Sequence, residues 1–273
     1  MSERELALKW YSVLRKRIAM EKSQEVNFKC YANGEFTQSS APLPYEQAVT
    51  LIVNGKAWME MICTPSLVVE LAVGFLYNER LIDSKAEITR LYVCDTADYV
   101  EVETLEEIKK PTTWVKTTGC AGGQTSQRLE FPIQPVLNEI TLSAETLDGL
   151  LRNFLEEQKR LSSSRGMHFS AISDGQVLLA VADDIGRHNT LDKLMGYALW
   201  HELIAKPAVL ITTGRISSEM LQKAARMGTA IVVSLNSPNV FTVQLAEEWG
   251  MTLVGYARPE RFNVYTHPER ILG

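Results

Sequence analysis

The chain has 273 residues, of which 45% are hydrophobic and 22% are charged, values typical of a globular protein with one large domain or two modest ones. The net charge of −5 argues against a nonspecific nucleic-acid binder, which needs a basic surface. The N-terminus lacks the apolar stretch of an export signal or a membrane span, so we expect a cytoplasmic protein that binds neither nucleic acid nor membrane.

The four cysteines are Cys30, Cys63, Cys94 and Cys120. They form no CxxC pair and no His/Cys cluster with zinc-finger spacing, so we expect reduced thiols and no metal site, zinc included. The first three lie on predicted strands or at a helix start, where a cysteine packs as a small hydrophobic residue. We therefore expect them to be structural.

The first half of the chain predicts a β-rich region preceded by a helix. Apolar side chains at helical spacing predict an N-terminal amphipathic helix within residues 1–24, and residues 25–142 are predicted to form a β-rich domain. Asn54-Gly55 between the runs TLIV and KAWMEMIC predicts a hairpin. Thr64 is expected to cap a helix that carries Pro65 in its first turn.

Cys120 lies in TTGCAGGQTS, residues 117–126, a run of small and hydroxyl-bearing residues that can neither pack a core nor continue a helix. A thiol on such a loop, with backbone N–H groups able to point at it, is well placed to react. The alternative is a chance cysteine in a mobile loop. Residue types alone favour neither interpretation.

Residues 143–273 predict an α/β domain. Ser143 is expected to cap a helix, Asp174-Gly175 to form a hairpin turn, and Asn189 to cap a second helix. From residue 208 the pattern alternates strand, helix, strand, helix, strand. Right-handed crossovers make such a unit a parallel sheet with helices on its faces, and ligands collect beyond the carboxyl ends of the strands.

Three loops, 212–218, 236–239 and 256–261, follow those strands. The first two lead into helix N-termini, where unpaired N–H groups and the helix dipole attract phosphate, and their arginines and serines could add contacts. For any single residue, an ordinary cap, turn or solvated arginine is an equally good interpretation, but the convergence favours a phosphate-bearing ligand. The candidate binding residues are Gly214, Arg215, Ser217, Ser218, Asn236, Ser237, Asn239, Tyr256, Ala257, Arg258, Pro259, Glu260 and Arg261.

The segment ADDIGRHNTLDK, residues 182–193, gathers charged side chains around a helix start. His188 could donate to a phosphate or move a proton, although a histidine satisfied by a neighbouring carboxylate is equally consistent. Neither a Walker A loop nor a strand followed by GxGxxG is present. A hydrolase that uses Ser217, Ser218 and His188 is the weakest hypothesis, because no GxSxG motif occurs.

Several long blocks follow one another in the sequence: VNGKAWMEM, CTPSLVVELAVGFLYNERLI, TTGC, GMHFSAI, DIGRHNTLDKLMG, TTGRISSEMLQKAARMG, LAEEWGMTLVGYAR and RFNVYTHPERI. In this order they resemble the FdhD family of formate dehydrogenase accessory proteins, and the resemblance covers most of the chain after residue 45.

The resemblance implies a two-part body whose second part, residues 143–273, is a cofactor-binding domain similar to the cytidine deaminase fold. It also implies a homodimeric cytoplasmic sulfur carrier, akin to a sulfurtransferase rather than a classical turnover enzyme. A cysteine desulfurase would pass sulfur to a loop cysteine as a persulfide. That sulfur would reach the molybdenum of a bound bis(molybdopterin guanine dinucleotide) cofactor, for which guanine nucleotides are possible mimics, before insertion into formate dehydrogenase.

By this resemblance the sulfur-carrying cysteine is Cys120, and the cofactor-binding stretch near the end is Tyr256 to Arg261. The chain departs from the family's paired motif G-C-G-V-C-G, because it reads G-C-A-G-G-Q, with Gly123 in the second position. One cysteine can still carry a persulfide, but an internal disulfide is excluded. The alternative is a chaperone that binds and inserts the cofactor without moving sulfur. Because H-x-E and P-C-x-x-C motifs are absent, no deaminase activity is implied.

Overall fold

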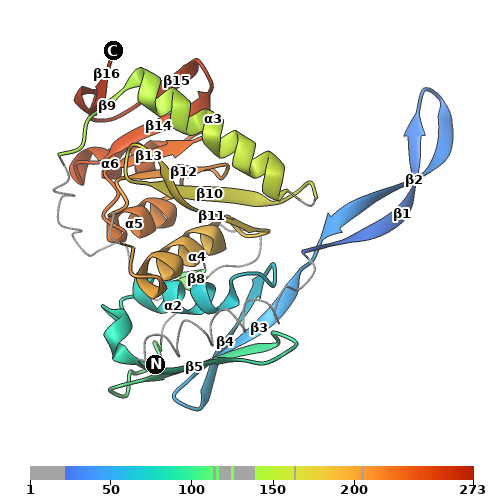
Figure 1. Cartoon of the computed structure of the whole chain (residues 1–273), viewed down its shortest axis with the longest axis vertical. Coiled ribbons are helices and arrows are strands. Elements are labelled where there is room, and N and C mark those ends of the chain that lie inside the picture. The colour runs from blue at the N-terminus through green and yellow to red at the C-terminus, as the bar shows by residue number, and fades with distance from the viewer. Residues whose placement is uncertain (1–21, 113–114, 117–123, 126–138, 163, 204–205) are drawn as a thin grey trace, which may run out of the picture.

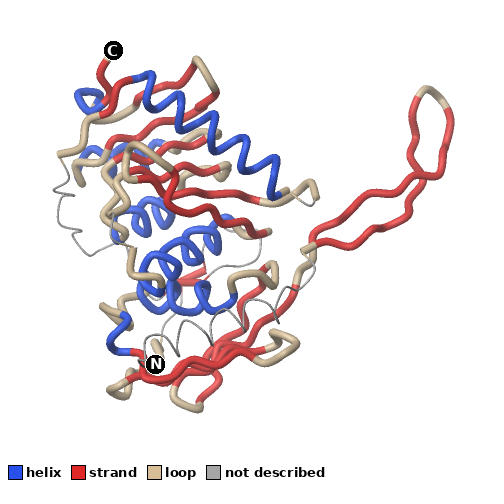
Figure 2. The backbone as a smooth tube through the Cα atoms, viewed as in Figure 1, coloured by secondary structure: helices blue, strands red, loops and turns tan. Residues whose placement is uncertain are grey.

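The computed structural model describes residues 22–112, 115–116, 124–125, 139–162, 164–203 and 206–273. In Figures 1 and 2 these residues form a projecting arm, an N-terminal body and a C-terminal body. Most of the predicted helix in residues 1–24 lies outside the described residues, and so does Cys120. The helix does not extend to residue 24, because β1 (Ser23–Ala32) already begins there.

The arm is an antiparallel ribbon of β1 and β2 (Glu35–Pro44), which extends away from both bodies (Figure 1). Its turn residues Asn33 and Gly34 both have positive φ, 53° and 89°, as a two-residue hairpin turn requires. Nearly every residue of the ribbon is exposed. The arm therefore has strand geometry without a core of its own.

The N-terminal body is a four-stranded sheet in the order β4-β3-β6-β5, packed against helix α2 (Val68–Asn78). The predicted hairpin is confirmed, since Asn54 and Gly55 have φ values of 49° and 72° between β3 and β4. The strands and the short helix η1 are β3 (Gln47–Val53), β4 (Lys56–Cys63), η1 (Lys85–Glu87), β5 (Ile88–Val93) and β6 (Tyr99–Thr104).

The predicted cap of α2 is wrong. The helix begins at Val68 after Leu67, whose φ of 52° is left-handed, and no side chain caps it. Thr64 instead contacts the C-terminal body: its N–H donates to the Asp184 carboxylate at 3.1 Å, and its hydroxyl accepts from the Ile185 N–H at 3.3 Å. The Thr64 hydroxyl is therefore engaged in a contact between the two bodies and does not cap the helix.

The C-terminal body is a six-stranded sheet in the order β11-β10-β12-β13-β14-β15. Strands β12, β13 and β14 are parallel, helix α3 covers one face, and helices α4, α5 and α6 pack on the other (Figure 1). The predicted α/β fold with parallel strands between helical layers is thus confirmed. The elements are α3 (Ala144–Leu161), β10 (His168–Ser173), β11 (Leu178–Asp184), α4 (Arg187–Trp200), β12 (Val209–Thr212), α5 (Ser218–Arg226), β13 (Ile231–Ser234), α6 (Val240–Glu248), β14 (Thr252–Arg258) and β15 (Arg261–Val264).

Short elements complete the described chain. The two-residue strands β7 (Val115–Lys116) and β8 (Gln124–Thr125) pair with each other. Strand β9 (Leu142–Ser143) pairs with β16 (Ile271–Leu272), which follows the short helix η2 (Pro268–Arg270). The start of the C-terminal body is therefore fixed against the end of the chain.

Side chains cap three of the four helices of the C-terminal body; the cap at Ser143 was predicted, and those at Ser217 and Asn239 were the alternative to a binding role. The side chains of Ser143, Ser217 and Asn239 accept from backbone N–H groups three residues later. Helix α4 is the exception, because it begins after Gly186 without a side-chain cap. Asn189 lies inside its first turn and donates to the carbonyl of Ile62 at 2.8 Å, so the predicted Asn189 cap is wrong.

The two bodies meet where helices α2 and α4 touch backbone to backbone. A Cβ atom on Gly74 would lie 1.7 Å from the Asp192 carbonyl oxygen, and one on Gly196 would lie 1.8 Å from that of Glu70. Beside this crossing, Lys193 and Asp184 form an ion pair at 2.6 Å with both side chains fully buried. Close packing and a buried polar contact thus hold the two bodies together.

Candidate functional site

One edge of the six-stranded sheet gathers the predicted binding loops. Strand β10 is antiparallel to both of its neighbours, β11 and β12, so β11, β12, β13 and β14 all run in the same direction. Their carboxyl ends therefore lie at one edge, and helices α4, α5 and α6 begin there. The sequence predicted three loops at this edge, and the topology adds the start of α4.

Hydrogen bonds tie these loops to one another. The Ser234 hydroxyl donates to the Gly214 carbonyl at 2.7 Å, and the Asn236 side-chain amide donates to the Thr213 carbonyl at 2.8 Å. The backbone N–H of Tyr256 donates to the Asn236 carbonyl at 3.1 Å. The predicted convergence of Gly214, Asn236 and Tyr256 is therefore present in the structure.

The start of α4 lies directly on the first of these loops. A Cβ atom on Gly214 would be 3.0 Å from the Cβ and 3.2 Å from the Cδ of Arg187, so the glycine leaves room for the arginine stem. Arg187 is 6% exposed. The structure thus places a buried cation at the edge where an anionic ligand was predicted.

His188 forms a buried pair with Glu219, because its Nε2 lies 3.1 Å from the carboxylate. Burial lowers the pKa of His188; the hydrogen bond with Glu219 opposes this shift, and the nearby charges of Lys223 and Arg187 add to it. Burial acts to raise the pKa of Glu219, but its contacts with His188 outweigh that effect and lower it. A neutral His188 therefore donates from Nε2 to a carboxylate, which leaves Nδ1 as an acceptor.

This pair does not form a hydrolytic triad. The Ser217 hydroxyl lies 3.5 Å from Nε2 of His188, the same nitrogen that contacts Glu219, whereas a triad places serine and carboxylate on opposite ring nitrogens. Ser217 also donates to Glu219 at 3.2 Å and caps α5. The geometry argues against the hydrolase hypothesis.

The three candidate arginines, Arg215, Arg258 and Arg261, are all exposed. The guanidinium of Arg258 donates to the carbonyls of Leu235 and Ala257, both at 2.7 Å, which holds it beside the loop that follows β13. These side chains give the sheet edge a positive rim. Such a rim suits phosphate groups better than an apolar ligand.

Two predicted binding residues point elsewhere. Glu260 pairs with Arg152 at 2.9 Å and its N–H donates to Asp148 at 2.6 Å, so it is held against α3. Ala257 is fully buried in the core, which leaves only its backbone for a ligand. The stretch Tyr256–Arg261 comprises the end of β14, the turn at Pro259 and Glu260, and the first residue of β15.

The remaining candidates stay at the sheet edge. Ser218, Ser237 and Pro259 are half-buried in their loops, while Asn239 is exposed at the start of α6. Tyr256 has a φ of 51° and is 53% exposed, so its ring is available for stacking.

Sequence reasoning missed Glu219. An acidic residue in the first turn of a helix usually complements the helix dipole, and nothing local marks it as a partner for a histidine 31 residues earlier. Arg187 was visible only as one charge among several in residues 182–193. Both residues gain their significance from the contact between α4 and the loop after β12.

The described cysteines lie away from this edge or are inert. Burial raises the pKa of the Cys63 thiol to about 12, and Cys94 is buried with its sulfur accepting from the Asp98 N–H. Cys30 lies on the arm and is partly exposed, so it is not a core residue. Cys120 belongs to the segment that joins β7 to β8 and lies outside the described residues.

The described residues offer neither a metal-binding cluster nor a helix suited to a membrane. No group of three or more His, Cys, Asp or Glu side chains there is arranged to hold a metal ion. None of the helices in the described part of the chain is both long enough and apolar enough to span a membrane.

Comparison with known proteins decides the family. The sequence model of the FdhD/NarQ family matches residues 44–272. The chain belongs to the FdhD/NarQ family. Family members named sulfur carrier protein FdhD include those of Bacillus licheniformis, 34% identical, and Bacillus subtilis, 35% identical; each alignment covers 88% of this chain and 94% of the relative.

The FdhD/NarQ fold is also represented among solved structures. A crystal structure from Desulfotalea psychrophila, assigned as a formate dehydrogenase accessory protein, superposes with a TM-score of 0.77 at 27% identity. The match covers 92% of this chain and 100% of that chain. The resemblance found in the sequence is therefore confirmed.

Proposed function

We propose that this chain is a sulfur carrier that serves formate dehydrogenase, with Cys120 as the residue that carries sulfur. The main support is family membership over residues 44–272, together with relatives that are themselves named sulfur carrier proteins. The glycine-rich surroundings of Cys120 also favour a thiol that reacts rather than packs. The partners are a cysteine desulfurase and the formate dehydrogenase apoenzyme.

Loading of Cys120 is a thiol exchange. Its thiolate attacks the outer sulfur of a persulfide on the desulfurase, the sulfur–sulfur bond there breaks, and the desulfurase cysteine leaves as a thiolate. One sulfur–sulfur bond forms as another breaks, so no external oxidant or reductant is needed. A second cysteine is not required, which fits the presence of Gly123 in the motif.

Delivery returns Cys120 to its starting state. The outer sulfur moves as a neutral atom to a molybdenum(IV) centre of the cargo, and the electron pair of the broken sulfur–sulfur bond stays on the Cys120 sulfur. The metal supplies two electrons and ends as molybdenum(VI) with a sulfido ligand. The cargo is the bis(molybdopterin guanine dinucleotide) cofactor.

The sheet edge fits the anionic parts of this cargo. The N-termini of α5 and α6 offer free N–H groups, Arg215 and Arg258 are exposed beside them, and Arg187 is buried behind Gly214. The exposed Tyr256 ring could stack on a guanine base. The acceptor Nδ1 of His188 could receive a hydrogen bond from the cargo.

A chaperone that binds the cofactor without moving sulfur is the second candidate, because Gly123 replaces the second cysteine of the family motif. Mass spectrometry after incubation with a desulfurase and free cysteine separates the two. The sulfur carrier gains one sulfur atom on Cys120, whereas the chaperone does not.

Matched variants make this test specific. Cys120→Ala should abolish formate dehydrogenase maturation in cells and leave guanosine diphosphate affinity unchanged, while Cys30→Ala, which alters a thiol on the arm, should retain both. Arg258→Glu should weaken nucleotide binding measured by calorimetry and still allow persulfide formation. Full maturation by Cys120→Ala would exclude the sulfur carrier.

A further inference from the structure

Strand β11 forms one edge of the six-stranded sheet, and among the described residues only β10 pairs with it. Its stretch QVLLAVA, residues 176–182, has no charged residue and no proline, the features with which natural proteins usually protect an edge. Residues 178–181 are all half-buried, whereas the central strands β12 and β13 bury every residue. An apolar edge of this kind needs a cover, which in natural proteins is often a helix or a loop.

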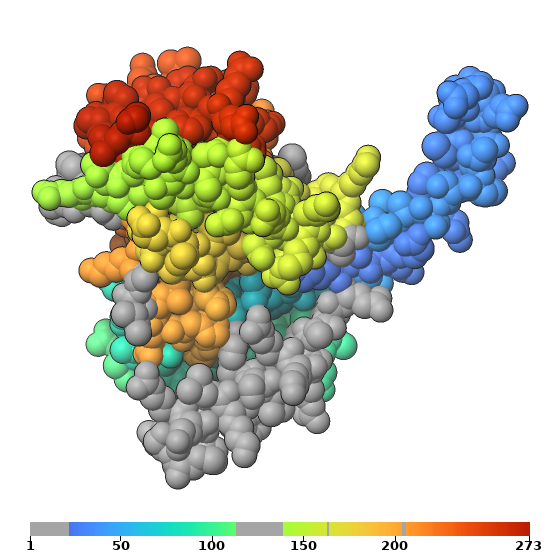
Figure 3. All heavy atoms as spheres, turned by 45° about the horizontal axis from the view of Figure 1, so that its top comes forward, coloured from blue at the N-terminus to red at the C-terminus, as the bar shows by residue number. Residues whose placement is uncertain are grey.

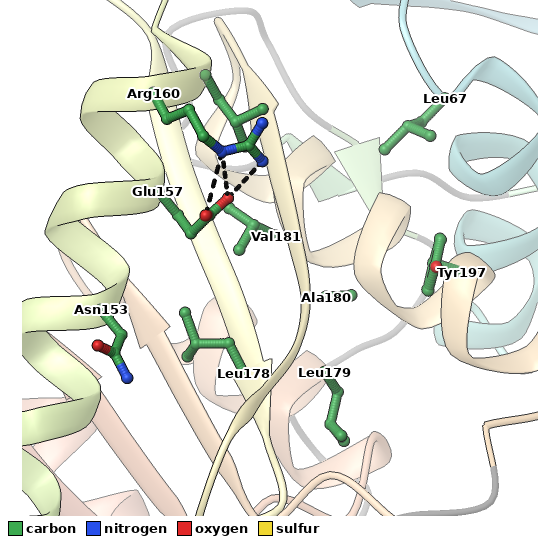
Figure 4. A pocket seen from close by; sticks show the side chains of 10 residues that line it. Leu67, Asn153, Glu157, Arg160, Leu178, Leu179, Ala180, Val181 and Tyr197 are labelled. Atoms are coloured by element: carbon green, nitrogen blue, oxygen red, sulfur yellow. Dashed lines mark hydrogen bonds and ion pairs between the residues drawn. The ribbon is translucent and has the colours of Figure 1, made fainter.

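A groove runs along this edge (Figure 4). It has a volume of about 450 Å³ and lies between α3, β11 and α4, with Leu161, Leu178 and Tyr197 among its lining side chains. Its two charged residues, Glu157 and Arg160, form an ion pair with each other at 2.6 Å. Their charges cancel, so the groove suits an apolar occupant. We call it the β11 groove.

The described part of the chain begins beside one end of this groove. The Lys22 ammonium donates to both carboxylate oxygens of Asp183, at 2.8 and 3.0 Å. Asp183 follows the groove-lining Val181 by two positions on β11. Figures 1 and 3 show the base of the arm on the same side of the body as the end of α3, which forms the other wall of the groove. The chain that precedes Lys22 therefore starts from the Val181 end of the β11 groove.

The preceding segment has the length and pattern of a helix that could cover the edge. Residues 1–21 carry the apolar stripe of the amphipathic helix that the sequence predicts, formed by Leu6, Trp10, Leu14 and Ile18. At 1.5 Å per helical residue, this stripe is roughly 18 Å long. Strand β11, with seven residues, is roughly 23 Å long. The stripe therefore matches the edge in length.

The charges of the two parts are opposite. Residues 1–21 contain five Lys or Arg residues and three Glu residues, a net charge of +2. Because the whole chain has a net charge of −5, residues 22–273 carry −7. The field of the body therefore attracts this segment.

We propose that residues 1–21 form this amphipathic helix and that its apolar stripe packs into the β11 groove of the same chain. The helix runs back along β11 from the ion pair of Lys22 with Asp183. Leu14 then lies roughly 12 Å from Lys22, the length of three to four strand residues, which brings it close to Ala180. The covered edge can no longer pair with a strand of another protein. The FdhD/NarQ match begins at residue 44, so this contact lies outside the matched region.

Hydrogen exchange followed by mass spectrometry tests the contact in the full chain. Residues 6–18 and residues 178–181 should both exchange slowly. The double variant Trp10→Ser/Leu14→Ser should make residues 6–18 exchange roughly 100-fold faster, because the helix loses two buried apolar side chains. Exchange at residues 178–181 should accelerate in the same variant, because the edge loses its cover.

The matched control is Lys9→Ser/Lys16→Ser. These two lysines lie on the other side of the predicted helix, away from the apolar stripe. The control introduces the same residue type at the same number of positions, so it should change exchange in both regions by less than about threefold. Circular dichroism and thermal melting confirm that each variant is folded before its result is interpreted.

Cross-linking shows whether the contact lies within one molecule. A chain with Leu14→Cys and Ala180→Cys, in which Cys30 and Cys120 are replaced by serine, is prepared with natural nitrogen and with heavy nitrogen. The two preparations are mixed, and a short bismaleimide is added. The two remaining cysteines are buried. Cross-linked peptides should join residues 14 and 180 of the same isotope.

Three results would overturn the proposal. Residues 6–18 that exchange as fast as an unstructured peptide in the wild-type chain would leave the groove open to a different protein. Cross-linked peptides of mixed isotope would place the segment on a second copy of the chain. A Trp10→Ser/Leu14→Ser variant that accelerates exchange at residues 6–18 but not at residues 178–181 would place the helix elsewhere on the body.

Discussion

Helices α2 and α4 bring Gly74 and Gly196 into contact with the backbone of the facing helix, whereas the β1–β2 arm leaves Phe28, Tyr31 and Phe36 exposed. At the junction there is no room for a single methyl group. On the arm, aromatic rings stand in solvent. The same chain therefore contains a region whose geometry is fixed by its own packing and a region whose described residues bury no core.

The two Asn-Gly hairpins show that turn chemistry does not decide which of these outcomes a segment has. Asn33-Gly34 and Asn54-Gly55 both adopt left-handed φ values. Strand β3, which leads into the second turn, buries Val49, Leu51 and Val53, whereas β1 and β2 bury no residue. Packing of the strands, rather than formation of the turn, separates a core hairpin from a projecting one.

The largest expected effect is at the helix junction. Gly74→Ala should reduce the free energy of unfolding by about 4 kcal/mol or more, because its Cβ would overlap a carbonyl oxygen of rigid backbone. Chemical denaturation measures the change. Gly149→Ala in α3, where a Cβ meets nothing within 4 Å, is the control and should stabilise the helix by up to about 1 kcal/mol. Equal effects of the two substitutions would contradict the close contact.

The next effect concerns the buried ion pair beside that junction. Lys193→Met should cost about 3–5 kcal/mol of unfolding free energy, because it leaves the Asp184 carboxylate buried without its cation. Urea denaturation checks this value. The matched control is Lys56→Met, which breaks an exposed pair with Glu107 and should leave stability nearly unchanged. A tolerated Lys193→Met would mean that water reaches the junction.

Alanine substitutions at two leucines compare how much the core and the arm contribute to stability. Leu51→Ala in β3 should destabilise the chain by about 2–5 kcal/mol, since this side chain is fully buried. Leu43→Ala in β2 should change stability by less than about 0.5 kcal/mol, since this side chain is exposed. A large loss from Leu43→Ala would show that the arm packs on its own body.

The smallest effect is a pH dependence at the sheet edge. Burial lowers the pKa of His188 below its ordinary value of 6.5, so the unfolded chain binds a proton at a higher pH than the folded chain. Stability is therefore unaffected above about pH 6.5 and falls as the pH drops below it, by up to about 1.4 kcal/mol per pH unit.

His188→Asn should reduce that slope. Unfolding free energies measured between pH 8 and 5 for the variant and the wild type provide the test. His168, whose pKa is also lowered mainly by burial, contributes a second slope of the same sign that should remain in the variant. Identical slopes in the two proteins would exclude His188 as a buried neutral group.

Much of the fold was predictable because its signals are local. The Asn54-Gly55 turn, the cap at Ser143, and the alternation of strands and helices after residue 208 all depend on neighbouring residues. The predictions at Thr64 and Asn189 were wrong for a shared reason. Both side chains form hydrogen bonds between the two bodies, to Ile185 and Ile62 respectively, and these partners lie more than a hundred residues away along the chain.

The candidate site likewise contains some features that the sequence predicted and others that it could not predict. The strand–helix order placed Gly214, Asn236 and Tyr256 at one sheet edge, and the structure joins them through hydrogen bonds. The pairing of His188 with Glu219 could not be predicted, because it depends on how α4 lies against the loop after β12. The ion pair of Glu260 with Arg152 was not predictable either, since it depends on how α3 packs beside the turn after β14.

The sequence by itself determined the family, the alternating α/β pattern and the position of Cys120 among glycines. Tertiary structure alone decided that Gly74 and Gly196 are contact points, that Arg187 lies behind the sheet edge, and that the arm projects away from both described bodies. The physical reason is the separation along the sequence over which each interaction acts. Periodicity and turn chemistry act between residues a few positions apart, whereas burial and backbone contact depend on segments that meet only after the chain has folded.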